Sequence, residues 1–296
     1  MSIRSTRVGY FYQDIYAVHL FIKHYLEHDI LAIFVDYEYD SSGHKSFDIR
    51  IIKNDRDEDN YEVKTGDAFK DQNTLIAEAF VDLIQAKKDG YISETGQAIL
   101  LISPEFRAQI ANYYAKLLYL KSHTLGAPES PEAIALFAAR MPAVLCTDNT
   151  ELHNRLKQIG VVCGEDNKIA HGERFSPIEQ IVIAQIRSLA ENLGIDSPNA
   201  SVFPEETLLR ELVYTVHANA GSNVSLYDEF RRLIISFFAR YSLPTTEITA
   251  GIGGTLDESR KDVEDRLASF EGQTVTKPTA VDINPPEGST IGGEDE

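Results

Sequence analysis

The sequence FDIRIIKNDRDEDNYEVKTG, residues 47–66, holds two predicted β-strands joined by a polar connection. FDIRII (47–52) and YEVKT (61–65) are rich in β-branched and aromatic residues, which favour extended backbone. The connection, residues 54–60, is so polar that it predicts an exposed loop. A further apolar run, ILAIFVDY at 30–37, predicts a strand before these two. The sequence therefore predicts a small meander of three strands.

Helices and one more strand are predicted on either side of this meander. Residues 9–28 carry apolar side chains at helical spacing, and a second helix is predicted from a cap at Asn73 to a stop at Gly90. AILLI (98–102) predicts a buried strand, and Ser-Pro-Glu at 103–105 predicts the start of the next helix. The order helix, strands, helix, strand, helix predicts a mixed α/β core.

The second half of the chain has a different pattern. After Gly126 most of the periodic segments are helical, among them one that begins with a capping box at residues 176–179 and one with apolar positions between 225 and 238. Residues 141–148, MPAVLCTD, are a candidate strand. From Gly251 onward the sequence becomes charged and rich in Gly and Pro, which is typical of disorder.

These patterns divide the chain into three predicted regions. Residues 1–125 form the α/β domain, and residues 126–250 form a mainly helical module for self-association or partner docking. Residues 251–296 form a disordered acidic tail.

Charge narrows the classes of function. The chain has 296 residues and a formal net charge of −18, which argues against a protein that grips nucleic acid through a broad basic face. Residues 255–296 hold eleven acidic and four basic side chains, a net of −7, which leaves −11 for the rest. DNA binding by this chain therefore requires a local basic strip, metal ions or a partner protein.

The sequence predicts a cytoplasmic protein with no membrane association. Cys146 and Cys163 belong to no CxxC pattern, which predicts reduced thiols. No apolar run approaches the roughly 18 residues that a transmembrane helix needs. The N-terminal sequence has no apolar segment followed by a small-residue cleavage site, so no secretory signal is predicted.

Asp48, Glu62 and Lys64 form the most informative set of polar residues. Asp48 lies near the start of one predicted strand, and Glu62 and Lys64 stand two apart on the next, so the latter two side chains leave the same face. If the two strands pair, two carboxylates and one ammonium group converge. Placing such charges inward on a sheet costs free energy unless they pair with each other or bind a metal.

This set of side chains suits phosphodiester hydrolysis. Mg²⁺ prefers hard oxygen ligands and keeps several waters, so one or two carboxylates suffice to hold it. The metal lowers the pKa of a bound water and polarises the phosphate. A lysine orients the nucleophile and stabilises negative charge in the transition state. A lone Glu-x-Lys is a weak signal, because alternating charge is common on solvated strands, but an Asp on the preceding strand strengthens it.

The motifs together resemble those of PD-(D/E)XK endonucleases. GYFYQ (9–13) opens a helix, an acidic strand follows, and FDI and YEVKT come next. This order is similar to the double-stranded-DNA endonuclease effector of cyclic-oligonucleotide antiphage (CBASS) systems and to the nuclease subunit of Lamassu defence systems. Those proteins carry a G-x-x-Y-Q start, an acidic residue and a terminal (E/Q)-x-K. The resemblance covers about residues 9–105, and the matching residues are Gly9, Tyr12, Gln13, Asp48, Glu62 and Lys64.

The resemblance implies a restriction-endonuclease-like mixed sheet flanked by helices. It implies a catalytic set made of Asp48, Glu62 and Lys64, with Gln13 beside them. It also implies Mg²⁺ or Mn²⁺ bound by Asp48, Glu62 and the backbone carbonyl of Val63.

Two residues of the implied site have alternative interpretations. Glu38 is a further candidate metal ligand, but it competes with Asp36 and Asp40, because strand alternation puts all three on one face. Gln13, taken without the resemblance, is more typical of a side chain that caps or bridges backbone groups.

The expected function is metal-dependent cleavage of double-stranded DNA by an effector subunit of a multi-protein antiphage system. CBASS effectors continue into a large nucleotide-sensing domain for which this sequence has no room, so an SMC-like ATPase of the Lamassu kind is the expected partner. Because one active site cuts one strand, double-strand cleavage predicts a homo-oligomer when active. The alternatives are a non-catalytic scaffold or binding subunit that retains the nuclease fold, and an RNase or nickase that uses the same site.

Overall fold

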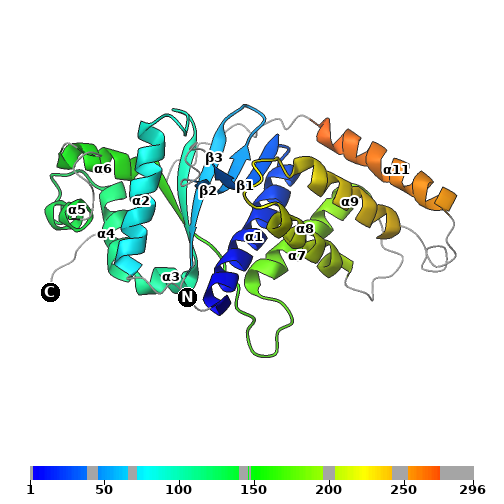
Figure 1. The fold of residues 1–296 in the computed structure, drawn as a ribbon, viewed down its shortest axis with the longest axis horizontal. Helices are drawn as coiled ribbons and strands as arrows, with labels where there is room; N and C mark the ends of the chain where they lie inside the picture. The colour runs from blue at the N-terminus through cyan, green and yellow to red at the C-terminus, as the bar shows by residue number, and fades with distance from the viewer. Residues whose placement is uncertain are drawn as a thin grey trace, which may run out of the picture.

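A five-stranded mixed sheet forms the centre of the protein in the computed structural model (Figure 1). Its strand order follows the chain, with β1, β2 and β3 antiparallel and with β4 and β5 added in parallel. The strands are β1 (Ala32–Glu38), β2 (Ser46–Ile52), β3 (Glu58–Lys64), β4 (Gln97–Ile102) and β5 (Ile159–Cys163). The structure describes residues 3–38, 46–65, 72–139, 146, 148–195, 204–241 and 253–273. The predicted α/β class, with a mixed sheet flanked by helices, is confirmed.

Two groups of helices cover the two faces of the sheet (Figure 1). The first group packs against Ala98, Leu100 and Ile102 of β4, and consists of α2 (Gln72–Lys88), α3 (Pro104–Gln109), α4 (Ala111–Ser122), α5 (Ser130–Ala138) and α6 (Asn149–Gln158). The second group packs around α1 and consists of α1 (Ile3–Leu26), α7 (Pro177–Asn192), α8 (Pro204–Asn219), α9 (Tyr227–Tyr241) and α11 (Gly253–Glu271).

Helix α1 is the centre of the second group. Residues 12–18 are buried without interruption, because the sheet lies on one side of the helix and α7 and α8 lie on the other. A helix that is buried on every side is a core helix rather than a surface one. Its C-terminal end meets α11, where the Tyr25 hydroxyl donates to Glu271 Oε1 at 2.7 Å.

The predicted helix starts at Ser103 and Ser176 are confirmed. Ser103 Oγ accepts the backbone N–H of Phe106 at 3.1 Å, with Pro104 in the first turn. Ser176 forms a full capping box with Glu179, whose carboxylate accepts the Ser176 backbone N–H at 2.8 Å. Such caps satisfy donors that a helix leaves free at its first turn.

Strand β1 has its outer edge covered by the connection between α8 and α9. The backbone N–H of Leu226 donates to the Ile33 carbonyl at 2.9 Å, and that of Gly221 donates to the Val35 carbonyl at 3.2 Å. A covered edge cannot pair with a strand of another molecule.

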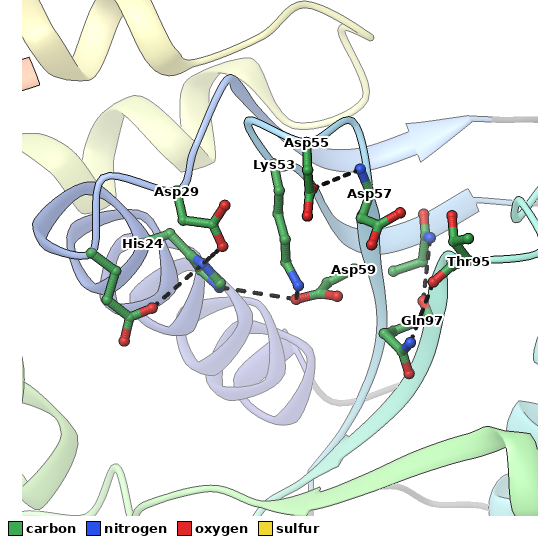
Figure 2. A network of polar contacts seen from close by, with 10 residues as sticks. His24, Asp29, Lys53, Asp55, Asp57, Asp59, Thr95 and Gln97 are labelled. Atoms are coloured by element: carbon green, nitrogen blue, oxygen red, sulfur yellow. Dashed lines mark hydrogen bonds and ion pairs between the residues drawn. The ribbon is translucent and has the colours of Figure 1, made fainter. Parts of the chain in front are cut away.

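The polar stretch at 54–60 is only partly the exposed loop that was predicted. Residues 54–56 are exposed, but Glu58, Asp59 and Asn60 are buried in β3. The buried carboxylates have partners, and Glu58 binds Arg50 at 2.5 Å. Figure 2 shows Asp59, which binds Lys53 at 2.9 Å and lies 4.0 Å from His24. Pairing with basic side chains makes a strand of consecutive polar residues possible.

The predicted boundary at residue 125 cuts through the sheet. Strand β5 and helix α6 come from a stretch for which no element was predicted, and β5 pairs with β4. Of the candidate strand at 141–148, residues 140–145 and 147 lie outside the described residues, and Asp148 caps α6. The five residues of β5 include Gly160 and lack strong alternation, so their sequence gives little strand signal.

The predicted tail is a helix over part of its length. Residues 253–271 form α11, which packs on α9, and Val263, Leu267 and Phe270 are buried. The prediction of disorder was wrong here, because these three apolar residues, spaced four and three apart, form one stripe on an otherwise charged helix. Residues 274–296 lie outside the described residues. Among the described helices, none is both long enough and apolar enough to cross a membrane.

Candidate functional site

Asp48 and Glu62 lie opposite each other on β2 and β3. The paired residues run from Ile52 with Glu58 to Ile49 with Tyr61, and the next step of this register brings Asp48 to Glu62. The ladder ends there, so the backbone N–H of Val63 is free to donate to Asp48 Oδ2, at 2.5 Å. This hydrogen bond fixes the Asp48 carboxylate against the end of β3.

Lys64 shares a face of β3 with Glu62, and its ammonium group is hydrogen bonded to Glu62 Oε1. The side chains of Glu62 and Lys64 are only 14% and 22% exposed. Asp48 interacts electrostatically with both of them. The structure therefore brings together the three residues that the sequence analysis placed at the centre of the site.

Gln13 links this group to α1. Its side-chain Nε2 donates to Asp36 Oδ1 at 2.6 Å and to the backbone carbonyl of Asp48 at 3.1 Å. Gln13 is buried and sits in the continuously buried part of α1. It thus bridges a backbone group, as the simpler interpretation expected, and it also lies beside the carboxylates, as the resemblance implied.

Burial and like charge act together on Asp48. Burial is the largest effect and Glu62 the second, and together they raise the pKa of Asp48 to about 8, although Lys64 and the Val63 N–H act in the opposite direction. For Lys64, burial is the largest single effect and lowers the pKa, but Glu62 and Asp48 outweigh it and raise that pKa overall. Two carboxylates therefore share the single ammonium group of Lys64, and a proton held by Asp48 relieves their repulsion.

Asp36 is the acidic residue of β1 that reaches this group. It stands between the Val35–Ile49 and Tyr37–Phe47 pairs, so the register places it opposite Asp48. Asp36, Asp48 and Glu62 thus form a row across three adjacent strands. Burial raises the pKa of Asp36, and the hydrogen bond from Gln13 counteracts part of that effect.

Alternation along β1 does not extend past Asp36. Its φ of +48° is a left-handed conformation, which Asp tolerates better than most residues, and it turns the strand locally. Glu38 is exposed, and its backbone N–H and carbonyl are hydrogen bonded to the Asn223 side chain. The expectation that Asp36, Glu38 and Asp40 share one face was wrong for Asp36 and Glu38, and Asp40 lies outside the described residues.

Asp14 is an acidic residue near this group that the sequence analysis missed. It is buried, interacts electrostatically with Asp36, and lies 3.4 Å from His217 Nδ1 on α8. Burial raises the pKa of Asp14 to about 6, His217 opposes that rise, and Asp36 adds to it. The one feature of the sequence that could have indicated Asp14 is its position next to Gln13 in a predicted helix.

The donor set at this site fits a hard divalent cation. Asp48 and Glu62 supply two carboxylates, and the Val63 carbonyl belongs to the same short segment; Mg²⁺ needs few protein oxygens because it retains waters. Within the described ranges, no three or more His, Cys, Asp or Glu side chains are grouped closely enough to bind a metal by themselves. Waters or substrate oxygens would therefore complete the coordination.

Comparisons of the chain with protein-family models, with curated proteins and with solved structures gave no significant match in any of the three.

Proposed function

We propose that the chain is a Mg²⁺-dependent or Mn²⁺-dependent endonuclease that hydrolyses double-stranded DNA through a PD-(D/E)XK-type centre on a restriction-endonuclease-like sheet. One observation carries the proposal: the Asp48 carboxylate on β2 interacts with both Glu62 and Lys64 on β3. Two carboxylates can hold a divalent cation and a neighbouring lysine can orient the attacking oxygen, so this set of groups suits metal-dependent phosphodiester hydrolysis.

Each residue has a separate role in the proposed reaction. Asp48, Glu62 and the Val63 carbonyl hold the cation, which when bound polarises the scissile phosphate and lowers the pKa of a water. Lys64 orients the attacking oxygen and stabilises the negative charge that develops at phosphorus. Gln13 positions Asp48 through its backbone carbonyl and keeps Asp36 hydrogen bonded.

The setting that we propose is an effector subunit of a multi-protein antiphage system. The formal net charge of −18 disfavours independent capture of DNA, so a DNA-binding partner such as an SMC-like ATPase supports the function. Cleavage of both strands further requires two active sites, and therefore a homo-oligomer when active.

Cleavage of supercoiled plasmid with Mg²⁺ or Mn²⁺ tests the proposal, with the full chain alone and co-expressed with the products of its neighbouring genes. We expect linear plasmid product in at least one of these two experiments. Glu62→Gln and Lys64→Ala should each lower the rate by about a hundredfold or more, the scale seen when a transition-state-stabilising group is removed. Glu94→Gln and Lys157→Ala remove matched charges at exposed positions and should cut normally. Equal rates in all five proteins would mean a contaminating nuclease.

A binding subunit that retains the fold but does not cut is the second candidate. The observation in its favour is that the Lys64 ammonium group already binds Glu62, while Asp48 already accepts the Val63 N–H. Calorimetric titration with Mn²⁺ separates the two candidates, because a cutting centre binds the cation and loses it in Asp48→Asn. Parallel digestion of RNA, single-stranded DNA and nicked plasmid distinguishes an RNase or a nickase.

A further inference from the structure

A pocket of about 460 Å³ lies between α1, α8 and the segment that leads into α7. Its volume falls within the range of small-molecule sites, roughly 300–1,000 Å³. The walls are mainly apolar and aromatic, with Phe11 and Ile15 from α1, Phe175 from the leading segment, and Leu209, Val213 and Tyr214 from α8. Asp14 connects the pocket to the group around Asp48 through its electrostatic interaction with Asp36, whereas Asp48, Glu62 and Lys64 do not line it.

Helical spacing explains how two helices supply these walls. Phe11, Asp14 and Ile15 are three and four residues apart on α1, and Leu209, Val213 and His217 are four apart on α8. Residues at such spacing lie on one side of a helix. Asp14 is therefore placed among apolar side chains by the same periodicity that builds the walls.

The Asp14 carboxylate is the unusual feature of this pocket. It is 4% exposed, and the ion pair described for it is with His217 Nδ1 at 3.4 Å, on a side chain that is 67% exposed. His217 carries a charge only when it is protonated. A buried carboxylate without a permanent cation is costly, and a cationic guest would remove that cost.

The other charged residues of the pocket have partners in the described structure. Arg174 and Arg210 both bind the carboxylate of Glu206. Glu179 accepts the hydroxyl and the backbone N–H of Ser176 in the capping box. Asp14 differs from these residues because it is buried and its ionic partner His217 has no permanent charge, whereas Arg174 and Arg210 are exposed.

We propose that this pocket binds a small organic cation with an apolar body, whose ammonium or guanidinium group reaches Asp14. The apolar part of such a ligand would contact Ile15, Leu209 and Val213, and the ring of Tyr214, which is 72% exposed, lies at the solvent side. Anionic ligands are disfavoured by Asp14 and by the net charge of −18.

Calorimetric titration of the full chain, without DNA or metal, tests this with three matched probes. These are 4-phenylbutylamine, 4-phenylbutan-1-ol and 4-phenylbutyrate, which are cationic, neutral and anionic at pH 7.5. We expect the amine to bind about tenfold more tightly than the alcohol, the factor associated with a charge-assisted hydrogen bond, and the carboxylate to bind weakest. Equal affinity for the amine and the alcohol would overturn the proposal.

Three variants locate the binding. Asp14→Asn should abolish the preference for the amine, while Glu211→Gln, which removes the same charge from an exposed position on α8, should keep it. Val213→Phe fills the pocket and should weaken the amine and the alcohol alike. If Asp14→Asn fails to fold, unchanged amine binding by Val213→Phe is still enough to refute the assignment.

A last arm identifies the source of the cation, because a free amine and a lysine side chain present the same group. Acetyl-phenylalanyl-lysine amide replaces the amine: tighter binding than that of the amine assigns the pocket to a protein partner, and weaker binding assigns it to a small molecule. The proposal does not depend on nuclease activity, since every measurement omits metal and DNA.

Discussion

Groups around Asp48 have opposing effects on its pKa. Glu62 faces it across the strand pair and repels its charge, while Lys64 and the Val63 N–H stabilise that charge. Burial adds to the repulsion, so the apo protein favours the protonated form of Asp48 at a pH where most aspartates are ionised. A divalent cation would reverse this preference.

Stability should therefore depend on pH through Asp48. Because its pKa is about 8 in the folded protein and near 4 when unfolded, the native state holds a proton that the unfolded chain has lost between these values. Stability is thus highest below pH 4 for this group and falls as pH rises to 8, by an amount on the order of a few kcal/mol.

Urea unfolding at pH 5.5 and pH 8, with and without Mg²⁺, measures this dependence. Asp48→Asn should flatten the pH profile relative to wild type, and Mg²⁺ should stabilise wild type more at pH 8 than at pH 5.5. The variant comparison is needed because Asp14 titrates in the same range. An unchanged profile in Asp48→Asn would remove the basis of this prediction.

Gln13 should matter for both stability and activity. Gln13→Ala leaves the half-buried Asp36 carboxylate without this donor, which costs about 1–3 kcal/mol. Loss of the contact to the Asp48 backbone should also lower cleavage about 10–100-fold, as for other groups that position metal ligands. Gln180→Ala, at an exposed helix position, is the matched control and should stay within about 0.5 kcal/mol of wild type. Urea midpoints and plasmid cleavage check both effects.

Residues that follow simple periodicity were predictable, and those that break it were not. Glu62 and Lys64 are two apart on a strand, so their shared face follows from the sequence alone. Asp36 accepts the hydrogen bond of Gln13 at a point where its positive φ interrupts the alternation, and no pattern of residue types indicates that conformation. The position of Asp14 depends on packing between α1 and α8, which sequence spacing within one helix does not determine.

At the scale of elements, α11 buries apolar side chains although its composition is mostly charged and polar. Leu267 is fully buried although the surrounding residues are mostly charged or polar. Leu267→Ala should destabilise the protein by about 2–5 kcal/mol, the usual cost of a cavity in a packed core. Leu118→Ala, at a position that is largely exposed on α4, should cost well under that. Equal urea midpoints for the two variants would show that α11 does not pack in solution.

Long apolar segments and caps were the elements most open to prediction. The capping box at Ser176 and the cap at Ser103 contain the donors and acceptors that begin a helix, so local sequence is sufficient. Strand β5 depends instead on β4, whose parallel edge it completes. The five residues of β5 therefore give little strand signal of their own, because the strand depends on its pairing with β4.

At the scale of the whole molecule, the two halves of the chain share one core around α1. A fragment of residues 1–125 would lack α7, α8 and β5 and would expose the apolar faces that they cover. We expect this fragment to show no cooperative thermal transition, whereas residues 1–273 should unfold in one. Circular dichroism and hydrogen exchange check this. A stable fragment would support the predicted domain boundary at residue 125.

The contact between Tyr25 and Glu271 can form only late in protein synthesis. The two residues are 246 positions apart, and ribosomes add about 5–20 residues per second, so α1 waits roughly 10–50 s for its last neighbour to be translated. During that interval the C-terminal end of α1 lacks the cover of α11, whose Phe270 packs against the Tyr25 ring. The need for chaperones during synthesis should therefore depend on how long α1 waits for the helices that cover it.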